Sequence, residues 1–487
     1  MELDDDRCYE ALRTRDRRFD GRFFVAVSTT GIYCRPVCPA RLPLRRNVRF
    51  FSCAAAAENA GFRACRRCRP ESAAGTPAWL GSSAIVARGL RLIDAGALDQ
   101  GDVARLAARL GVGARQLRRL FARHLGASPA EIARARRVHF ARLLIDQSDR
   151  PITELAFAAG FASLRQFNHA FRTSFGCAPR ELRRTRAERD PGGAEALAFR
   201  LSYRPPFDWD ALATFFAGRA IAGVESVTGS CYRRTIELHG APGWIEVSPL
   251  AADSALLLRV CAPAGTDLLR LVERVRRIFD LDADPLAIGE ALAGRGLLGP
   301  QSEVPPGLRI PGAWDVFELG VRAILGQQVT VRAASTLAAR LVRAFGKPVA
   351  GAPPGLSHLF PSPAFLADAD VASLGLPRAR AAAIRNFSSA LARGELLLDG
   401  ARGLDDAVAR LSAVPGIGDW TAHYIALRAL GEPDAFPAGD LALRKALGRA
   451  GKPTTAAQAE RLAAVFRPWR SYAAMALWQS LAVKEMK

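Results

Sequence analysis

Four cysteines near the N-terminus constrain the fold of this chain more than any other feature. Cys34 and Cys38 form a C-x3-C pair, and Cys65 and Cys68 form a C-x2-C pair further along. Two close pairs of thiolates are a common arrangement in tetrahedral structural zinc sites. Nine cysteines among 487 residues are too few for a secreted disulfide framework, so reduced thiols or metal ligands are favoured. The spacing therefore predicts one Zn²⁺ ion bound by all four cysteines.

The charge of the chain indicates a polyanionic partner. The formal net charge is +21 at pH 7, and the isoelectric point is about 10.6. A bias toward arginine codons would raise the arginine content everywhere, but most of the basic surplus precedes residue 190. Contacts with phosphates explain such a local surplus. We therefore expect nucleic acid as the partner.

Composition and length exclude several other classes of protein. With 49% hydrophobic residues the chain can build packed cores, and its length exceeds what one core usually holds, so several domains are expected. No uninterrupted apolar stretch of about 18 residues is present, which predicts that no helix spans a membrane. The acidic start MELDDDRCYE does not match a signal peptide. A cytoplasmic location without a membrane partner is the expectation.

Shifts in pattern divide the chain into five parts. The soft stretch ESAAGTPAW precedes a series of helical patterns, and AERDPGGAE carries the Pro-Gly signature of a linker. Strand patterns in RTIELHG, GWIEVSP and ALLLRVCA then alternate with two helical segments, and helical patterns return from Trp314. The predicted fold class is multidomain α+β, with a small α/β domain, an all-α domain, an α+β domain and a second all-α domain. The predicted bounds are 1–78, 79–186, a linker at 187–195, 196–305 and 306–487.

An internal repeat lies in the first all-α part. LFARHLGASPAEI at 120–132 aligns with AFRTSFGCAPREL at 170–182. Each copy predicts a helix-turn-helix, although packed helical hairpins often imitate this motif. The second helices, at 114–124 and 164–175, would each enter a major groove, about 34 Å apart. This part resembles the AraC-type DNA-binding domain. The expected DNA-contacting residues are Arg115, Arg118, Arg119, Arg165, Gln166 and Asn168.

The four cysteines lie in a basic segment that contains TTGIYCRPVC and GFRACRRC. This segment resembles the N-terminal zinc domain of Ada-type adaptive-response regulators. The resemblance implies that Cys34 accepts a methyl group from a DNA methyl-phosphotriester, once per molecule. Because the segment is basic, Arg41 and Arg45 are expected to contact the DNA. From the spacing alone, a purely structural zinc ion remains the alternative.

Methylation of Cys34 would also act as a switch. Converting one of four thiolates to a thioether removes one negative charge from the zinc complex and lowers its repulsion from the DNA backbone. DNA binding by the attached helix-turn-helix unit would then strengthen. We expect such an activator to have RNA polymerase as a further partner.

The C-terminal part contains LSAVPGIGDWTAHYIALRALGEPDAFPAGDLALRKA at 411–446. Its tight turn, Pro415-Gly416-Ile417-Gly418, allows a close backbone approach, and its N–H groups could hold a DNA phosphate. Residues 196–487 resemble the AlkA-type 3-methyladenine DNA glycosylases II of the helix-hairpin-helix superfamily. The α+β part at 196–305 corresponds to their TATA-binding-protein-like domain. Asp440 takes the position of the essential aspartate.

The resemblance implies excision of a flipped, alkylated purine such as 3-methyladenine or 7-methylguanine. Asp440 would stabilise the oxocarbenium-like sugar, and aromatic faces would stack on the cationic base. Trp420 stands where lyases place a Schiff-base lysine, so the enzyme is expected to be monofunctional. A monovalent cation at the hairpin is also implied. The expected pocket residues are Trp420, Tyr424, Trp478 and Gln327.

Three positions depart from the AlkA pattern. Gln328, the expected DNA wedge, stands where AlkA-type enzymes have a leucine. Gln479 replaces a tyrosine, and Gly439 replaces an aspartate. The expected function is a bifunctional alkylation-damage response protein: a methyl-phosphotriester sensor, a transcriptional activator and a glycosylase in one chain. The alternatives are a damage-sensing regulator with a silent glycosylase domain, and a glycosylase with a purely structural zinc domain.

Overall fold

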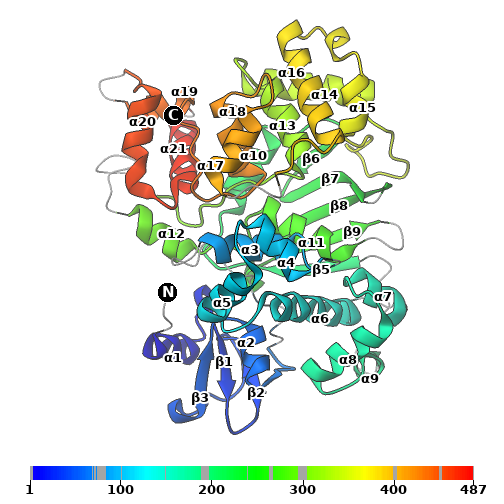
Figure 1. Ribbon diagram of the computed structural model, residues 1–487, viewed down its shortest axis with the longest axis vertical. Helices are drawn as coiled ribbons and strands as arrows, with labels where there is room; N and C mark the ends of the chain where they lie inside the picture. Colours follow the sequence, from blue (N-terminus) through cyan, green and yellow to red (C-terminus); the bar gives the residue numbers. More distant parts are fainter. Residues whose placement is uncertain are drawn as a thin grey trace. The chain divides into compact units, whose positions relative to one another are not determined.

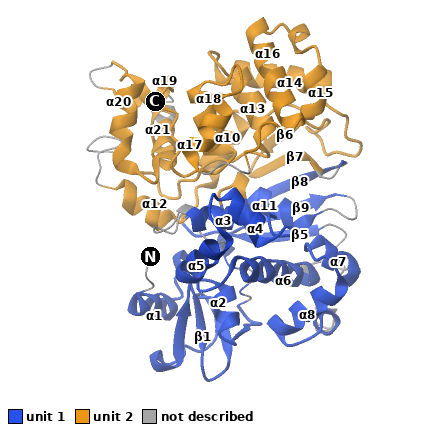
Figure 2. Ribbon diagram, in the orientation of Figure 1, with its two compact units in different colours: residues 1–205, 238–276, 281–283 blue, residues 206–237, 277–280, 284–487 orange. Residues whose placement is uncertain are grey.

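The computed structural model describes residues 4–68, 70, 73, 84–99, 101–147, 150–187, 197–238, 240–262, 267–293, 304–398, 403–448 and 452–485. Within these, the chain forms two compact units, coloured separately in Figure 2. The first contains residues 1–205, 238–276 and 281–283, and the second contains 206–237, 277–280 and 284–487. Trp79 and residues 188–195 of the predicted linker lie outside the described residues.

The first unit begins with the small cysteine-containing domain. Its four-stranded sheet has the order β3-β1-β2-β4. Strand β1 is antiparallel to β2 and β3, and β2 is parallel to β4. A core that includes Cys8, Leu12, Phe23 and Val25 lies between the sheet and the first helix. The elements are α1 (Asp5–Thr14), β1 (Phe24–Val27), β2 (Ile32–Cys34), β3 (Val48–Phe51), α2 (Ala54–Asn59) and β4 (Arg63–Ala64).

Seven helices follow in the same unit, and the internal repeat maps onto them directly (Figure 1). The predicted second helices at 114–124 and 164–175 are confirmed as α5 and α8. Long helix α6 joins the two copies. The bounds are α3 (Ala84–Asp94), α4 (Val103–Arg109), α5 (Ala114–Leu125), α6 (Pro129–Gln147), α7 (Ile152–Ala158), α8 (Leu164–Phe175) and α9 (Pro179–Ala187).

Both repeat copies end their second helix in the same way. Leu117, Phe121 and Leu125 recur at helical spacing on α5 and are buried, whereas the arginines face outward. Gly126 and Gly176 follow α5 and α8 with φ angles of 70° and 67°. Only glycine adopts this left-handed conformation without a steric cost, so both helices stop there.

The α+β segment contributes to both units. In the first unit, β5 (Leu197–Ser202), β9 (Ala255–Cys261) and β8 (Ala241–Leu250) pair antiparallel in that order. Helix α11 (Leu268–Ile278) also belongs to this unit. In the second unit, β6 (Glu225–Thr228) pairs antiparallel with β7 (Cys231–Leu238). The predicted strands in RTIELHG, GWIEVSP and ALLLRVCA are therefore confirmed.

The rest of the second unit is helical, as predicted. Helices α13, α16 and α18 contribute to one large apolar core. The bounds are α10 (Trp209–Ala217), α12 (Pro285–Leu292), α13 (Val316–Leu325), α14 (Val331–Phe345), α15 (Pro363–Asp368), α16 (Arg378–Ala392), α17 (Leu404–Ser412), α18 (Asp419–Arg428), α19 (Leu441–Ala446), α20 (Ala456–Ala463) and α21 (Arg470–Glu485). Among the helices described, none has the length and apolar character needed to cross a bilayer.

A buried ionic network ties β6 and β7 to α13. Arg234 donates to Glu318 at 2.7 Å, and Arg322 donates to Glu225 at 2.8 Å. Burial alone would raise the pKa of Glu225, but the charges of Arg322 and Arg234 outweigh it and lower this pKa to about 2. The carboxylate is therefore ionised at neutral pH and partnered on both sides, as a buried charge must be.

Candidate functional site

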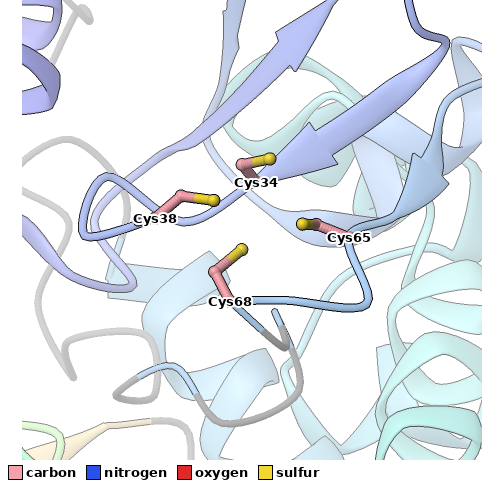
Figure 3. Close-up of side chains that lie close together, drawn as sticks. All are labelled: Cys34, Cys38, Cys65 and Cys68. Carbon is pink, nitrogen blue, oxygen red and sulfur yellow. The ribbon is translucent and has the colours of Figure 1, made fainter. Parts of the chain in front are cut away.

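The four cysteines predicted to bind metal converge on one point. Cys34 ends β2, Cys65 follows β4, and Cys38 and Cys68 lie in the turns beyond. The parallel pairing of β2 with β4 brings the two sequence pairs side by side. All four Sγ atoms lie within 4.8 Å of one another, and Figure 3 shows the sulfurs pointing toward a common centre. This arrangement matches the donor set of a tetrahedral zinc site.

The chemistry of the four thiols fits a bound cation. The neighbouring thiol of Cys34 lowers the pKa of Cys38 to about 7, whereas hydrogen bonds from the same group of thiols raise the pKa of Cys68. Four thiols this close cannot all ionise without a positive charge between them, and Zn²⁺ supplies that charge. The cluster therefore supports one Zn²⁺ ion, held by Cys34, Cys38, Cys65 and Cys68.

The arginines near the cysteine cluster differ in burial and in ion pairing. Arg35 is half-buried and paired with Asp20, and its backbone N–H donates to the Cys68 Sγ at 3.3 Å. Arg41 is exposed, whereas Arg45 is half-buried and pairs with Asp5 at 3.2 Å. Arg35 thus stabilises the cysteine loop, and Arg41 is the freer of the two arginines predicted to contact DNA.

The predicted recognition helices present most of their polar side chains to solvent. On α5, Arg115, Arg118 and Arg119 are exposed, and on α8, Arg165 and Gln166 are exposed. Asn168 is half-buried. Ser163 caps α8 by accepting a hydrogen bond from the Gln166 N–H, which fixes the helix start. Both helices therefore offer a basic or polar face of the kind that reads a major groove.

In the second unit, the hairpin Pro415–Gly418 joins α17 to α18. Ile417 is buried in the core, and Gly416 has a φ of 96°. A Cβ at Gly416 would lie 2.3 Å from the Ala383 Cβ, so only glycine fits. Gly418 is the N-cap of α18, and no side chain caps this helix. The backbone N–H groups of its first turn therefore remain available to bind an anion.

Asp440 follows α18 in the chain and caps the N-terminus of α19. Its carboxylate accepts hydrogen bonds from the Trp420 Nε1 at 3.0 Å and the Trp478 Nε1 at 3.1 Å, one on each oxygen. The Leu443 N–H donates to the same group at 3.0 Å. The sequence indicated stacking surfaces at both tryptophans, and the structure adds that their indole N–H groups hold Asp440 in place.

Asp440 borders a cavity of about 1210 Å³ that is lined by all the predicted pocket residues. Trp420 and Tyr424 stack with an interplanar angle of 11° and a centroid distance of 5.3 Å. Trp478 meets Tyr424 edge to face at 6.3 Å. The cavity therefore places aromatic faces beside one carboxylate, and aromatic faces can stack on a flat ring.

Sequence reasoning did not identify the basic residues of this cavity. Arg219, Arg322 and Arg428 line it together with Phe215. The Arg219 guanidinium lies 3.8 Å from the Phe215 ring centroid. Burial opposes ionisation of Tyr424, but the charges of Arg428 and Arg219 lower its pKa below the usual value. Tyr424 and Arg428 lie at i, i+4 spacing on one helix, which is a local sequence signal for a contact between them. In the structure, the Arg428 Nη1 donates to the Tyr424 hydroxyl at 2.8 Å.

The wedge region also lines the cavity. Gln327 donates to the Gly416 carbonyl at 3.1 Å and to the Thr421 Oγ1 at 3.2 Å, so it links this loop to the hairpin. Gln328 is exposed and has a φ of 56°, which is unusual for a residue other than glycine. At Gly439 a Cβ would meet only the Trp420 Cβ, at 3.8 Å. Position 439, where glycine replaces the aspartate of AlkA-type enzymes, therefore has space for a side chain.

Four protein-family models match the chain in succession. They are the metal binding domain of Ada at residues 7–71, a helix-turn-helix domain at 106–185, the AlkA N-terminal domain at 198–315 and the HhH-GPD superfamily base excision DNA repair protein at 321–471. The models follow the order in which the resemblances were expected, and the AlkA N-terminal model extends to residue 315.

Curated relatives match the whole chain or single parts of it. A probable bifunctional transcriptional activator/DNA repair enzyme AlkA from Mycobacterium tuberculosis is 45% identical over 99% of this chain and 97% of its own length. DNA-3-methyladenine glycosylase 2 from Escherichia coli is 34% identical over 58% of this chain and 96% of its own. The bifunctional activator Ada from Escherichia coli is 52% identical over 15% of this chain and 20% of its own. The chain therefore belongs to the family of bifunctional transcriptional activator/DNA repair enzymes that join an Ada-type zinc domain and helix-turn-helix to an AlkA-type glycosylase.

Proposed function

We propose that the second unit hydrolyses the N-glycosidic bond of alkylated purines in double-stranded DNA, with 3-methyladenine and 7-methylguanine as substrates. The observation that carries this proposal is the position of Asp440 at the edge of the aromatic cavity, with both carboxylate oxygens held by indole donors. A flipped purine would stack on Trp420, Tyr424 and Trp478, and the carboxylate would face its sugar.

Alkylation at N3 or N7 gives the purine a positive charge, so the base leaves with the electron pair of the glycosidic bond and becomes neutral. Asp440 then stabilises the positive charge that develops on the sugar, and it accepts a proton from the water that attacks C1′. Gln328 fills the space left in the duplex. No lysine stands at position 420, which supports a monofunctional enzyme without lyase chemistry.

The test is Asp440→Asn, assayed on duplex DNA treated with a methylating agent. We expect base release to fall to the uncatalysed level, because the amide carries no charge to stabilise the sugar. Asparagine keeps an acceptor for the N-cap, but its amide nitrogen must face one indole N–H, so the thermal unfolding midpoint should fall slightly while the variant stays folded. A variant that folds and still releases 3-methyladenine at the wild-type rate would show that Asp440 has a different role.

We propose further that Cys34 accepts the methyl group of a DNA methyl-phosphotriester. The Cys34 sulfur attacks the methyl carbon, an S–C bond forms, the O–CH₃ bond breaks, and the phosphate leaves as an ordinary diester. Zn²⁺, when bound, keeps its cysteine ligands as thiolates at neutral pH. Cys34 is the half-buried member of the four, whereas Cys38, Cys65 and Cys68 are buried, which supports its assignment as the acceptor.

Mass spectrometry of the protein after incubation with methylated DNA tests this assignment. We expect one added methyl group, on Cys34, and none in Cys34→Ser. Cys177→Ser is the matched control because Cys177 is half-buried and lies outside the cluster. A methyl group found on Cys38, Cys65 or Cys68 in the wild type would refute the assignment.

The remaining expectations belong to the same proposal. Methylation of Cys34 strengthens promoter binding, and the activator contacts RNA polymerase. A monovalent cation binds carbonyls of the hairpin; the Pro415 carbonyl already accepts from Asn386 and the Gly416 carbonyl from Gln327. The protein acts in the cytoplasm, where its DNA lies. The two alternatives make different predictions: a silent glycosylase domain releases no base, and a structural zinc domain takes up no methyl group.

A further inference from the structure

The zinc domain, defined here as residues 4–68, binds the last carbonyl of each recognition helix. Ser52 Oγ and Cys53 Sγ donate to the Leu125 carbonyl, at 3.0 and 3.2 Å, where α5 ends. Arg66 Nη2 donates to the Phe175 carbonyl at 3.5 Å, where α8 ends. Leu125 and Phe175 occupy equivalent positions in the internal repeat. Carbonyls at helix C-termini lack partners within the helix, so one domain completes both helices.

The glycines that follow these carbonyls also touch the zinc domain. A Cβ at Gly126 would lie 3.2 Å from the Ala56 Cβ, and a Cβ at Gly176 would lie 3.1 Å from the Arg63 Nη1. Both distances are shorter than ordinary contact, so the domain is packed closely against both helix ends. The two copies of the repeat are therefore held by one rigid neighbour at matching places.

A polar cluster of buried and half-buried side chains also joins the zinc domain to α6 and α8. Glu58 of α2 accepts from the Tyr33 hydroxyl at 2.9 Å and from the Ser174 hydroxyl at 3.4 Å. The His139 Nε2 of α6 lies 2.9 Å from the same carboxylate. Burial would raise the pKa of Glu58, but its bonds with His139, Tyr33 and Ser174 lower it. Tyr33 is fully buried and directly precedes Cys34, so the cluster connects the strand of the proposed methyl acceptor to α6 and α8.

The rest of the contact is an apolar seam. Ala55 of α2 packs with Ala127 and Ala135, and Cys53 and Ile132 border them. Small side chains let α2 approach α6 closely (Figure 1). The zinc domain therefore contacts the helical domain through apolar packing at α6 and through hydrogen bonds at α6 and at the ends of α5 and α8.

We propose that the zinc domain is a structural brace for promoter reading: it docks on α6 and on the ends of α5 and α8, and so fixes the two recognition helices relative to each other. Two recognition helices bind successive major grooves only at a set spacing. Loss of the docking surface therefore loosens both helices, even when each repeat copy stays folded. This inference goes beyond methyl acceptance, because it requires the fold of the zinc domain and not the reaction at Cys34.

Hydrogen exchange in the full-length, zinc-loaded chain, followed by mass spectrometry, tests the brace. The variants are Glu58→Gln and Tyr33→Phe, which keep shape but weaken the polar cluster, and Glu10→Gln is the control because Glu10 is exposed on α1 and pairs only locally with Arg13. We expect exchange in α6 and in the last turn of α8 to rise about tenfold in Glu58→Gln, less in Tyr33→Phe and not in the control. Peptides from α13 serve as the internal reference.

A variant on the opposite side of the seam gives the reciprocal result. Ala127→Leu overfills the seam from the turn before α6, where Ala127 is buried with Ala55, and Ala130→Leu, at an exposed position of α6, is its control. We expect Ala127→Leu to raise exchange in α2 and β4 of the zinc domain while four thiols stay protected from alkylation by zinc. Unchanged exchange across the contact in both Glu58→Gln and Ala127→Leu would overturn the proposal. Zinc loss in Glu58→Gln leaves Ala127→Leu as the deciding variant.

Discussion

At Asp440, two indole N–H groups and one backbone N–H converge on a single carboxylate. Such a group has a fixed orientation, and catalytic carboxylates depend on orientation as much as on charge. The sequence predicted Asp440, Trp420 and Trp478 as members of one pocket, because each lies in a motif of the glycosylase family. It could not predict that the tryptophans bind the aspartate, since an indole offers both a face and a donor and the sequence does not indicate which one is used.

Trp478→Phe separates these two uses. Phenylalanine keeps an aromatic face but removes the donor to the Asp440 Oδ1. A hydrogen bond to a charged group contributes about 1.5–3 kcal/mol, so the single-turnover rate of base release should fall about tenfold to a hundredfold. Trp469→Phe is the control, because Trp469 is buried against Tyr472 and does not touch Asp440. An unchanged rate in Trp478→Phe would mean that the indole donor does not contribute.

At the scale of single elements, the hairpin between α17 and α18 depends on one glycine. Gly416→Ala places a Cβ 2.3 Å from that of Ala383 at a φ of 96°. Strain of this kind costs about 1–3 kcal/mol, so we expect a lower thermal midpoint and weaker binding to duplex DNA. Gly375→Ala has a similar φ of 78° with open space around the Cβ, and it should lose less on both measurements. Equal losses would show that the contact with Ala383 is unimportant.

The buried network between β6, β7 and α13 predicts an acid response. The pKa of Glu225 is lowered to about 2 in the folded protein, against about 4.3 for an unfolded glutamate. Its stabilising contribution is therefore complete above the unfolded value and is lost as the pH falls toward 2. Glu225→Gln should lower the free energy of unfolding at pH 7 by about 3–5 kcal/mol and make it less dependent on pH in this range.

Urea unfolding between pH 2 and 7, followed by tryptophan fluorescence, measures both effects. Glu395→Gln is the control, since Glu395 forms an exposed pair with Arg393, and such pairs contribute little. A Glu225→Gln variant with the stability and acid response of the wild type would contradict the assigned charge state of Glu225.

Helices and cysteine pairs were predictable from local sequence patterns, but contacts between residues far apart in the sequence were not. The recognition helices follow from a repeat and an apolar spacing, and the cysteine pairs follow from two short motifs. Arg219 and Phe215 reach the cavity of Asp440 from α10 and the turn after it, about half the chain away in sequence. Likewise, Glu58 and His139 meet only because α2 packs on α6. Single side chains such as these carry no periodic signal, so only the fold identifies them.

At the scale of the whole molecule, a net charge of +21 predicts a steep dependence of DNA binding on salt. A protein that contacts 6–10 phosphates loses about 10³–10⁵ in affinity between 50 and 200 mM salt. We expect a loss in this range for the full-length chain on an unmodified duplex, measured by fluorescence anisotropy. Replacing Arg115, Arg118 and Arg119 with glutamine should reduce the slope. A slope near zero would show that the charge serves another purpose.

We propose that one chain both accepts a methyl group and releases alkylated bases. The direct test is to incubate the zinc-loaded protein with DNA treated with a methylating agent, to weigh the protein by mass spectrometry and to separate the released bases by chromatography. We expect a single added methyl group on Cys34 together with free 3-methyladenine. Base release without the methyl adduct, or the adduct without base release, would show that the chain has only one of the two activities.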